Sequence, residues 1–511
     1  MDRSKLSVLL VTDSTGSIIA QDLELLYPER VTVLDFTKEA HKLKVLQKHT
    51  QVVTAVHDGA NLGKLDYGAV REYAEQGGQV VSCLFEYAQD AGLAFSKTHV
   101  RDRIEPAIRI MRECEVTQGF TVGDTIWWYG AVSGAADQAY VNQMIQRQIM
   151  NPVEDAKLTI LGRSTVNNGA VMLEEKVGRG RILAIDLMSL NKPWYNSHGC
   201  TNKWLFVGNF IGGSVRYGKH YPSKLSYDEF VAWMHETADA HPDMSVVAEG
   251  PCSDGRQMYT LRIGKPSNPT VYYGGAVHGW EWENCYGLVR LAELICEAPK
   301  VEGMATRKLH WVIMPVQNPY GFDQFLRQNA DGVDLNRNFD HAWEQYPMPQ
   351  DVAMPWDYNY KGSRAASARE TQIIQGLIDE FRPVGCVDFH TAHYVMLVPH
   401  KYNKRLVDAI HKDIQDRLRD RYLCQRPYGG DYQQVNMDPR GEDRDSPYLI
   451  SYAAKRGCAA PILIEMSGNR DDMHGMVMTT DTVVEICLAV ADRCLRYVAA
   501  SKRRRSKSKK R

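Results

Sequence analysis

The sequence lacks long apolar runs, a secretory leader and paired cysteine motifs. No stretch of 18 apolar residues occurs in the 511 residues, so we expect no membrane-spanning helix. The N-terminal segment has one short apolar run without the longer apolar region and cleavage site of a secretory signal. The 11 cysteines are scattered, odd in number and free of any C-x-x-C pair. We interpret them as reduced thiols, mostly in the core, of a cytoplasmic protein.

Net charge is also nearly absent, because the formal value at pH 7 is only -1. Residues 502–511 contain eight basic and no acidic residues, which leaves the remainder of the chain at -9 (-1 minus 8). A basic run can form an arm that binds nucleic acid or an anionic surface. This run has no aromatic residue for base stacking. We therefore expect 501–511 to be a basic, disordered, solubilising tail, and we expect no nucleic-acid partner.

The length and the alternation of apolar segments predict more than one domain. With 44% hydrophobic and 24% charged residues, the composition is that of a globular protein too long for one ordinary domain. From residue 1 to 217, short apolar segments alternate with helix-length segments, which is typical of a mostly parallel α/β sheet. The expected strands are 7–12, 31–36, 51–56, 79–85 and 181–187, and a helix is expected at 67–76.

The segments 73–81, 178–187 and 204–211 resemble the class I glutamine amidotransferase-like fold, and a looser resemblance extends over 1–217. It implies a flavodoxin-like parallel-sheet domain. Active members hold a nucleophilic cysteine in a tight turn flanked by glycines, but Cys83 lies in VSCLFE without a flanking glycine. We expect Cys83 to be a buried strand residue and His198, a conceivable partner for it, to be a surface loop residue. The domain is therefore predicted to be non-catalytic, and either to bind a ligand or to shape the entrance of an enzyme domain.

A second domain is expected at 222–498, where Ser226 and Glu229 have the spacing of a capping box before a helix. Within it, an apolar segment from Val271 runs through two glycines into His278-Gly-Trp-Glu281, and a helical pattern at 284–296 follows. A His and a Glu three residues apart at a strand-to-helix turn can direct a nitrogen and a carboxylate at one point. That donor set suits zinc.

The spacing alone is not specific. His341 and Glu344 have it too, in a polar stretch that no apolar strand precedes. We therefore do not expect that second pair to bind metal.

Two further apolar strands end in groups of the same kind. The segment 385–390 ends in His390, and the segment 461–465 ends in Glu465. A buried carboxylate at such a place is costly unless it faces a partner or a cavity. Ligands gather at the carboxyl ends of strands in open α/β sheets, so these residues are expected to lie together with His278 and Glu281.

The polar, Gly- and Asn-rich stretch 318–339 contains Arg327, Asn336 and Arg337. A guanidinium offers a fork that matches a carboxylate, so the stretch suits an anion site. A solvated loop with surface arginines explains it equally well.

In chain order, His278-x-x-Glu281, Arg327, the GVDLNRNF block, His390 and Glu465 resemble the carboxypeptidase A-like family of zinc metallocarboxypeptidases over about 222–498. The resemblance implies an α/β domain with a mixed sheet that binds Zn²⁺. The implied ligands are His278, Glu281 and His390, with one coordination position left for water.

The resemblance also implies the roles of the surrounding residues. Glu465 would be the general base and Arg327 would stabilise the oxyanion. Asn336 and Arg337 would bind the free α-carboxylate of a peptide. Aligning through Gly457 places Ile450 at the floor of the specificity pocket, which favours an apolar or aromatic terminal residue. The mobile tyrosine of many members has no clear counterpart, and Tyr432 and Tyr448 are the nearest candidates.

Three functions can be considered for these residues. The first is a zinc metallocarboxypeptidase that hydrolyses the C-terminal amide bond of peptides. The second is a zinc deacylase or amidohydrolase that acts on a small N-acyl amino acid or a γ-linked peptide, because the same machinery would serve. A binding protein with a vestigial site would require a missing ligand residue, and none is missing. The expected partner is a peptide or small amide with a free carboxylate. We expect no interaction with a membrane. Assembly into a homo-oligomer is left open.

Overall fold

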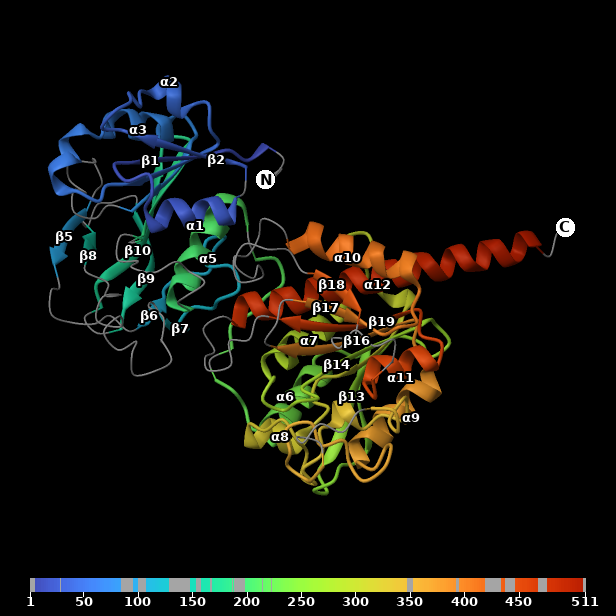
Figure 1. Cartoon of the computed structure of the whole chain (residues 1–511). Helices are drawn as coiled ribbons and strands as arrows, with labels where there is room; N and C mark the ends of the chain where they lie inside the picture. The colour runs from blue at the N-terminus through green and yellow to red at the C-terminus, as the bar shows by residue number, and fades with distance from the viewer. Residues whose placement is uncertain are drawn as a thin grey trace.

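The computed structural model forms two units, each built around a β-sheet (Figure 1). It describes residues 5–27, 29–83, 95–99, 107–127, 148–152, 158–165, 168–185, 187, 198–213, 215–221, 223–346, 353–391, 395–418, 433–436, 446–466 and 476–508. Among these residues, no helix combines the length and the apolar character needed to cross a membrane.

The N-terminal sheet has a parallel half that matches the sequence prediction. Its five strands all run parallel, in the order β2 (Val31–Asp35), β1 (Val8–Thr12), β3 (Gln51–Ala55), β4 (Gln79–Ser82) and β11 (Gly180–Ile185). Strands β1 and β3 are buried along their whole length. Their apolar centres reflect this, because helices or loops cover both faces of a parallel sheet.

The other half of this sheet is antiparallel and was not predicted. Beyond β11 the sheet continues with β10 (Ala170–Val177), β9 (Leu158–Ser164), β6 (Ala107–Ile110) and β7 (Thr125–Trp127), while β5 (Phe95–His99) pairs with β8 (Gln148–Pro152) beside β10. The chain reverses between β10 and β11 in a tight turn where Gly178 has a φ of 56°. The sheet is therefore mixed, and the expectation of a parallel sheet holds only for its first half.

The helical segments of this unit are short except the last one. They are α1 (Ile18–Leu26), α2 (Leu43–Leu46), η2 (Gly59–Lys64), α3 (Tyr67–Glu75) and α5 (His198–Gly212). The Ser17 side chain caps α1, and the Asp66 side chain caps α3, by accepting hydrogen bonds from backbone N–H groups of the first turn.

The second sheet is mixed, as expected, and its centre is parallel. The strand order is β12 (Met244–Pro251), β13 (Gln257–Ile263), β15 (His310–Met314), β14 (Thr270–Gly275), β16 (Gly385–Thr391), β19 (Ala460–Met466), β17 (Val395–Val398) and β18 (Gln433–Asn436). Strands β15, β14, β16 and β19 run parallel to one another. The carboxyl ends of these four strands consequently meet at one edge of the sheet.

Helices cover both faces of this second sheet. They are α6 (Tyr227–Asp239), α7 (Glu283–Glu297), η5 (Thr306–Lys308), α8 (Pro319–Gln324), η6 (Leu335–Arg337), α9 (Arg369–Phe381), α10 (Lys404–Leu418), α11 (Leu449–Lys455) and α12 (Met476–Ser508). The predicted capping box of Ser226 and Glu229 is confirmed at the start of α6. Along β14, Tyr273 packs with residues of α7 and α12, whereas Tyr272 packs with residues of α9 and α11, as the alternation of a strand requires.

Helix α12 ties the second unit to the linker that follows the first. The buried Asp481 of α12 accepts hydrogen bonds through Oδ1 from the backbone N–H groups of Arg216 (3.0 Å), Tyr217 and Gly218 (2.8 Å). One hydrophobic cluster contains residues of both units, among them Phe120 and Val477. The two units therefore share a continuous core at this junction.

The end of α12 differs from the expected disordered tail. The helix continues to Ser508 and projects beyond the rest of the molecule, so residues 501–508 are helical; residues 509–511 lie outside the described part (Figure 1). Lys and Arg have high helix propensity, and cations near a helix C-terminus are favoured by the helix dipole. These effects extend a helix that packing has already started.

Candidate active site

The turn between β14 and α7 carries the first two candidate ligands, His278 and Glu281, and both are buried. The backbone enters the turn at Ala276 with a φ of 48°. Gly279 is required for close packing, because a Cβ there would lie 1.8 Å from the carbonyl carbon of Gly321. The sequence Gly-Gly-Ala-Val-His-Gly therefore lets the turn approach α8 while it directs His278 and Glu281 to the same side.

His390, at the end of β16, completes a cluster with His278 and Glu281. Nδ1 of His278 lies 3.2 Å from Oε1 of Glu281, and Nδ1 of His390 lies 3.0 Å from Oε2 of Glu281. One ligand atom from each of the three residues can be chosen so that all lie within 4.8 Å of one another. The three residues singled out in the sequence are thus brought together at the carboxyl ends of two neighbouring parallel strands, β14 and β16.

A buried carboxylate holds the far nitrogen of each imidazole. Oδ1 of Asp334 lies 3.1 Å from Nε2 of His278, and Oδ2 of Asp388 lies 3.0 Å from Nε2 of His390. Histidines that bind metal commonly donate their other N–H to a carboxylate, which fixes the tautomer and turns the free nitrogen to the metal. Two nitrogens and a carboxylate held in this way fit a catalytic zinc ion. The chain's own residues therefore suit Zn²⁺.

Sequence reasoning did not assign Asp334 or Asp388 a role, although a signal for each was present. Asp388 precedes His390 by two residues on β16, and residues at this spacing share one face of a strand. Asp334 is part of the GVDLNRNF block, in which the sequence analysis assigned roles only to Asn336 and Arg337.

The histidines and the carboxylates of the cluster shift one another's pKa values toward the charged forms. Burial alone would raise the pKa of Glu281, but His278 and His390 outweigh it and hold the pKa well below its usual value. Burial would lower the pKa of His390, but Asp388 and Glu281 raise it well above the ordinary value. The Glu281 carboxylate is therefore ionised near neutral pH, which is the form that binds a cation.

Arg327 and Arg337 both lie near the same carboxylate oxygen of Asp334. Nη2 of Arg327 lies 2.7 Å and Nη1 of Arg337 lies 3.9 Å from Oδ2 of Asp334. Nη1 of Arg327 is also 3.2 Å from Nδ1 of His278, which places this guanidinium beside the metal cluster. The two arginines stack on different rings, Arg327 on Tyr358 at 4.4 Å and Arg337 on Tyr448 at 4.5 Å.

Asn336 connects the arginine loop to His390. Its Nδ2 lies 3.3 Å from Nε2 of His390, and its Oδ1 accepts a hydrogen bond of 3.1 Å from the backbone N–H of Leu449. Its own backbone N–H donates to Oδ1 of Asp334. The loop that the sequence left open as either an anion site or a solvated loop is therefore buried next to the metal cluster at Asp334 and Asn336.

Glu465 lies next to His390, because the two residues are register partners on the parallel strands β16 and β19. Its Oε2 is buried and has no hydrogen-bond partner in the described part of the chain. Burial raises the pKa of Glu465 to about 7, with Glu281 and Asp388 adding to the shift and His390 and Arg327 opposing it. A carboxyl group with this pKa can both accept and donate a proton near neutral pH.

The remaining predicted residues are placed as follows. Ile450 is fully buried in α11 and packs with Tyr448 and Leu463. Tyr432 lies outside the described residues, whereas Tyr448 is buried and stacks on Arg337.

The second pair with the His-x-x-Glu spacing and Cys83 lie outside the metal cluster. Glu344 is exposed, and neither His341 nor Glu344 belongs to the metal cluster of the described residues. Cys83 is buried with 1% of its surface exposed, directly after β4. His198 begins α5, and its side chain lies outside the described part.

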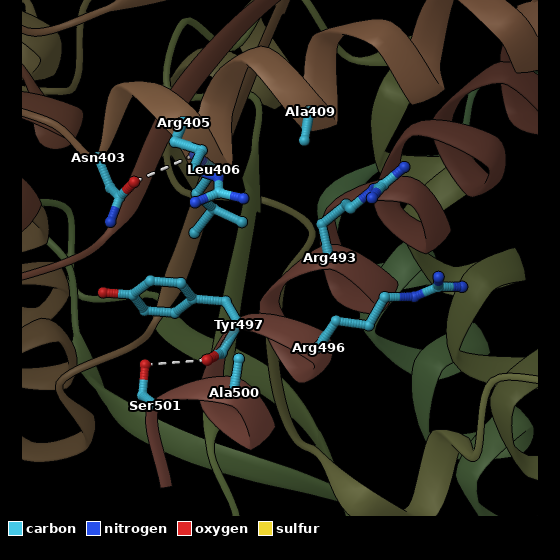
Figure 2. A pocket seen from close by; sticks show the side chains of 9 residues that line it. All are labelled: Asn403, Arg405, Leu406, Ala409, Arg493, Arg496, Tyr497, Ala500 and Ser501. Carbon is cyan, nitrogen blue, oxygen red and sulfur yellow. Dashed lines mark hydrogen bonds between the residues drawn. The ribbon is translucent and has the colours of Figure 1, made fainter. Parts of the chain in front are cut away.

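A hollow of about 330 Å³ lies between α10 and α12 (Figure 2). Its lining includes Arg405, Arg493 and Tyr497. The N–H of Asn403, another lining residue, donates to the carbonyl of Ala459, which directly precedes β19. Glu465 lies near the other end of the same strand. The hollow is therefore at the opposite edge of the sheet from the metal cluster and is not part of the candidate active site.

The fold and the cluster together define an α/β protein with a buried His/Glu/His metal site at the carboxyl ends of parallel strands. Residues 230–492 match the family model described as zinc carboxypeptidase. This match covers more than half of the 511 residues, and the chain belongs to the zinc carboxypeptidase family.

Several known proteins are similar to part of the chain. The chain is 26% identical to human mast cell carboxypeptidase A over 244 residues, which are 42% of this chain and 57% of the relative. It is 26% identical to bovine carboxypeptidase B over 217 residues, 37% of this chain and 50% of the relative. It therefore spans little more than half the length of these relatives. The crystal structure of carboxypeptidase A from Helicoverpa armigera shares 21% identity at a TM-score of 0.44, covering 55% of this chain and 74% of that one.

Proposed function

We propose that this chain is a zinc-dependent carboxypeptidase that hydrolyses the C-terminal amide bond of peptides. The observation that carries the proposal is the joint placement of His278, Glu281 and His390 as a metal cluster beside the raised-pKa carboxyl of Glu465. His278, Glu281 and His390 would hold Zn²⁺, which when bound lowers the pKa of a water molecule and polarises a carbonyl group.

The residues around the cluster have distinct parts in this proposal. Glu465 accepts a proton from the attacking water and later donates it to the leaving amine, as its pKa of about 7 allows. Arg327, 3.2 Å from His278, donates to the oxygen on which charge develops. Arg337 and Asn336 bind the terminal carboxylate, since a guanidinium and an amide can both donate to it. Ile450 and Tyr448 shape the site of the terminal side chain, which we propose to be apolar or aromatic.

The decisive experiment compares three substrates with the wild-type protein and a Glu465→Gln variant. One substrate is a peptide with a free C-terminus, the second is the same peptide with a C-terminal amide, and the third is an N-acyl amino acid. A carboxypeptidase releases the terminal residue from the first only, and Glu465→Gln abolishes the release while zinc content stays the same. Release of acyl groups from the third substrate alone would instead favour the deacylase.

For the first unit we propose an amidotransferase-like domain over about 1–217, joined to a catalytic domain over about 222–498. The parallel strand order β2-β1-β3-β4-β11 supports this, because it is the order of flavodoxin-like folds. The proposed domain is non-catalytic, since Cys83 is buried and a nucleophilic thiol needs access. A test is glutamine hydrolysis: we expect none from the wild-type protein, and ammonia release that Cys83→Ser abolishes would contradict the proposal.

A further inference from the structure

One short segment exposes several large apolar side chains close to the metal cluster. Met354, Trp356 and Tyr358 are 66%, 49% and 52% exposed, respectively. They are three of the six large hydrophobic residues that the described part of the chain exposes. Single exposed apolar residues are ordinary, but a group of them on one surface usually marks a binding site.

Two less exposed aromatic rings, those of Trp280 and Tyr320, pair with rings of this segment. The ring of Tyr358 is 6.3 Å from that of Trp280, and the ring of Trp356 is 6.2 Å from that of Tyr320. These separations are typical of interacting aromatic pairs. We call the five residues Trp280, Tyr320, Met354, Trp356 and Tyr358 the aromatic shelf.

The aromatic shelf directly adjoins the metal cluster. The carbonyl of Tyr358 accepts a hydrogen bond of 3.0 Å from Nε of Arg327, whose Nη1 lies 3.2 Å from His278. The indole N–H of Trp280 donates to Oε1 of Glu281 at 3.2 Å. A molecule that reaches the cluster therefore has the shelf within contact distance.

The backbone at Trp356 is also unusual. Its φ is 73°, in the left-handed region that a bulky side chain rarely adopts. Its N–H donates to the carbonyl of Gly332 at 3.0 Å, and a Cβ on Gly332 would lie 2.7 Å from that nitrogen. Strained bulky residues tend to occur at functional sites, where surrounding structure maintains them. The indole packs closely on Gly332, because a Cβ there would lie 2.9 Å from its Cδ2, and this contact helps to maintain the conformation.

The two arginines give the direction in which a peptide crosses the site. In the proposed function, the terminal carboxylate binds at Arg337, which stacks on Tyr448. Arg327 stacks on Tyr358 instead and stands beside His278. With the carboxylate at Arg337 and the scissile bond at the cluster, the residues that precede that bond are expected beside Arg327 and Tyr358.

We propose that the aromatic shelf binds apolar or aromatic side chains that precede the scissile bond of a peptide substrate. The inference rests on the proposed carboxypeptidase function and adds a preference on the side of the bond opposite to the terminal residue. Rings on the shelf would stack on aromatic substrate side chains, and the flexible Met354 would fill the gaps beside them.

The test uses two peptides with the same terminal residue, N-acetyl-Gly-Phe-Leu and N-acetyl-Gly-Ser-Leu. For each, kcat/KM is measured with the zinc-loaded full chain as wild type and as the variants Trp356→Gly and Met354→Ser. Glycine tolerates the positive φ at position 356, and the Met354 side chain is mostly exposed. Both variants are therefore expected to fold. Met111→Ser, at an exposed site in the first unit, is the matched control.

We expect the wild-type protein to prefer the Phe peptide, and Trp356→Gly to reduce the ratio of the two kcat/KM values about threefold to tenfold. Met354→Ser should reduce it less, and Met111→Ser should leave it unchanged. A wild type without preference, or a ratio that both shelf variants leave intact, would overturn the inference while the carboxypeptidase function stands. Zinc-loaded protein that releases leucine from neither peptide would overturn the proposed function itself.

Discussion

Asp388 and His390 share one face of strand β16, and Oδ2 of Asp388 lies 3.0 Å from Nε2 of His390. Asp334 holds Nε2 of His278 in the same way at 3.1 Å. Each carboxylate leaves Nδ1 of its partner directed at Glu281. The metal cluster is therefore organised by a second layer of acidic residues from two separate parts of the chain.

Replacing Asp388 by Asn should weaken zinc binding without unfolding the protein. The amide is close in shape to the carboxylate but lacks its charge, and loss of such outer partners typically costs about 10-fold to 100-fold in metal affinity. Competition with a chromophoric chelator measures the change. Asp340→Asn, at an exposed site, is the control and should bind zinc like the wild type. Equal affinity in the two variants would show that Asp388 does not position His390.

The pH dependence of hydrolysis should report on Glu465. Burial raises the pKa of this carboxyl to about 7, and only its deprotonated form can accept a proton from water. We therefore expect kcat/KM to fall as the pH drops below about 7, and to fall about tenfold per pH unit well below the pKa. A profile that stays flat down to about pH 5 would be the behaviour of an ordinary, unshifted glutamate and would contradict this assignment.

Arg337, which is proposed to bind the terminal carboxylate, should matter for peptides with a free C-terminus. Arg337→Ala should lower kcat/KM for a peptide with a free C-terminus by about 10-fold to 100-fold, as expected for the loss of a hydrogen bond to a charged group. Arg337→Lys should retain part of the activity, because an ammonium keeps the charge but not the planar fork. Arg369→Ala, on the exposed start of α9, is the control. If all three variants matched the wild type, another residue would have to bind the carboxylate.

The junction between the units should depend on Asp481. Its Oδ1 accepts backbone hydrogen bonds from three consecutive linker residues, 216–218, and the side chain is fully buried. Asp481→Ala should lower the free energy of unfolding by about 2 to 4 kcal/mol, because the linker N–H groups lose a charged acceptor. Denaturant unfolding followed in both units measures this. Asp492→Ala, farther along α12, should change stability much less; equal effects would argue against a specific role of Asp481.

The sequence was most informative where a strand is buried on both faces or a turn needs particular residues. All five parallel strands of the first sheet were predicted, because each contains a short apolar or β-branched run next to polar segments. Strand β9 (LTILGRS) has a glycine and an arginine in its second half, so its apolar run is short, and it was missed. Residues 501–508 were taken for a disordered tail, because composition does not reveal that packed residues upstream have already started a helix.

The sequence predicted those residues of the candidate site that lie at strand ends or in the GVDLNRNF block. His278, Glu281 and His390 were predicted as ligands and form the metal cluster. The contacts of Asp388 with His390 and of Tyr358 with Arg327 depend on how separate loops pack, which local spacing does not specify. The assignment of Ile450 remains a prediction about a residue that lies fully buried beneath Tyr448.

Zinc-dependent release of C-terminal residues is the central claim, and a peptide digest followed by mass spectrometry tests it most directly. The purified chain is assayed on a peptide library as prepared, after chelation, and after stoichiometric zinc is restored. The account predicts that terminal residues are released one at a time, that chelation stops the release, and that zinc restores it in the wild type but not in Glu465→Gln. Terminal-residue release that persists after chelation, or no release from any peptide by the zinc-loaded protein, would contradict the account.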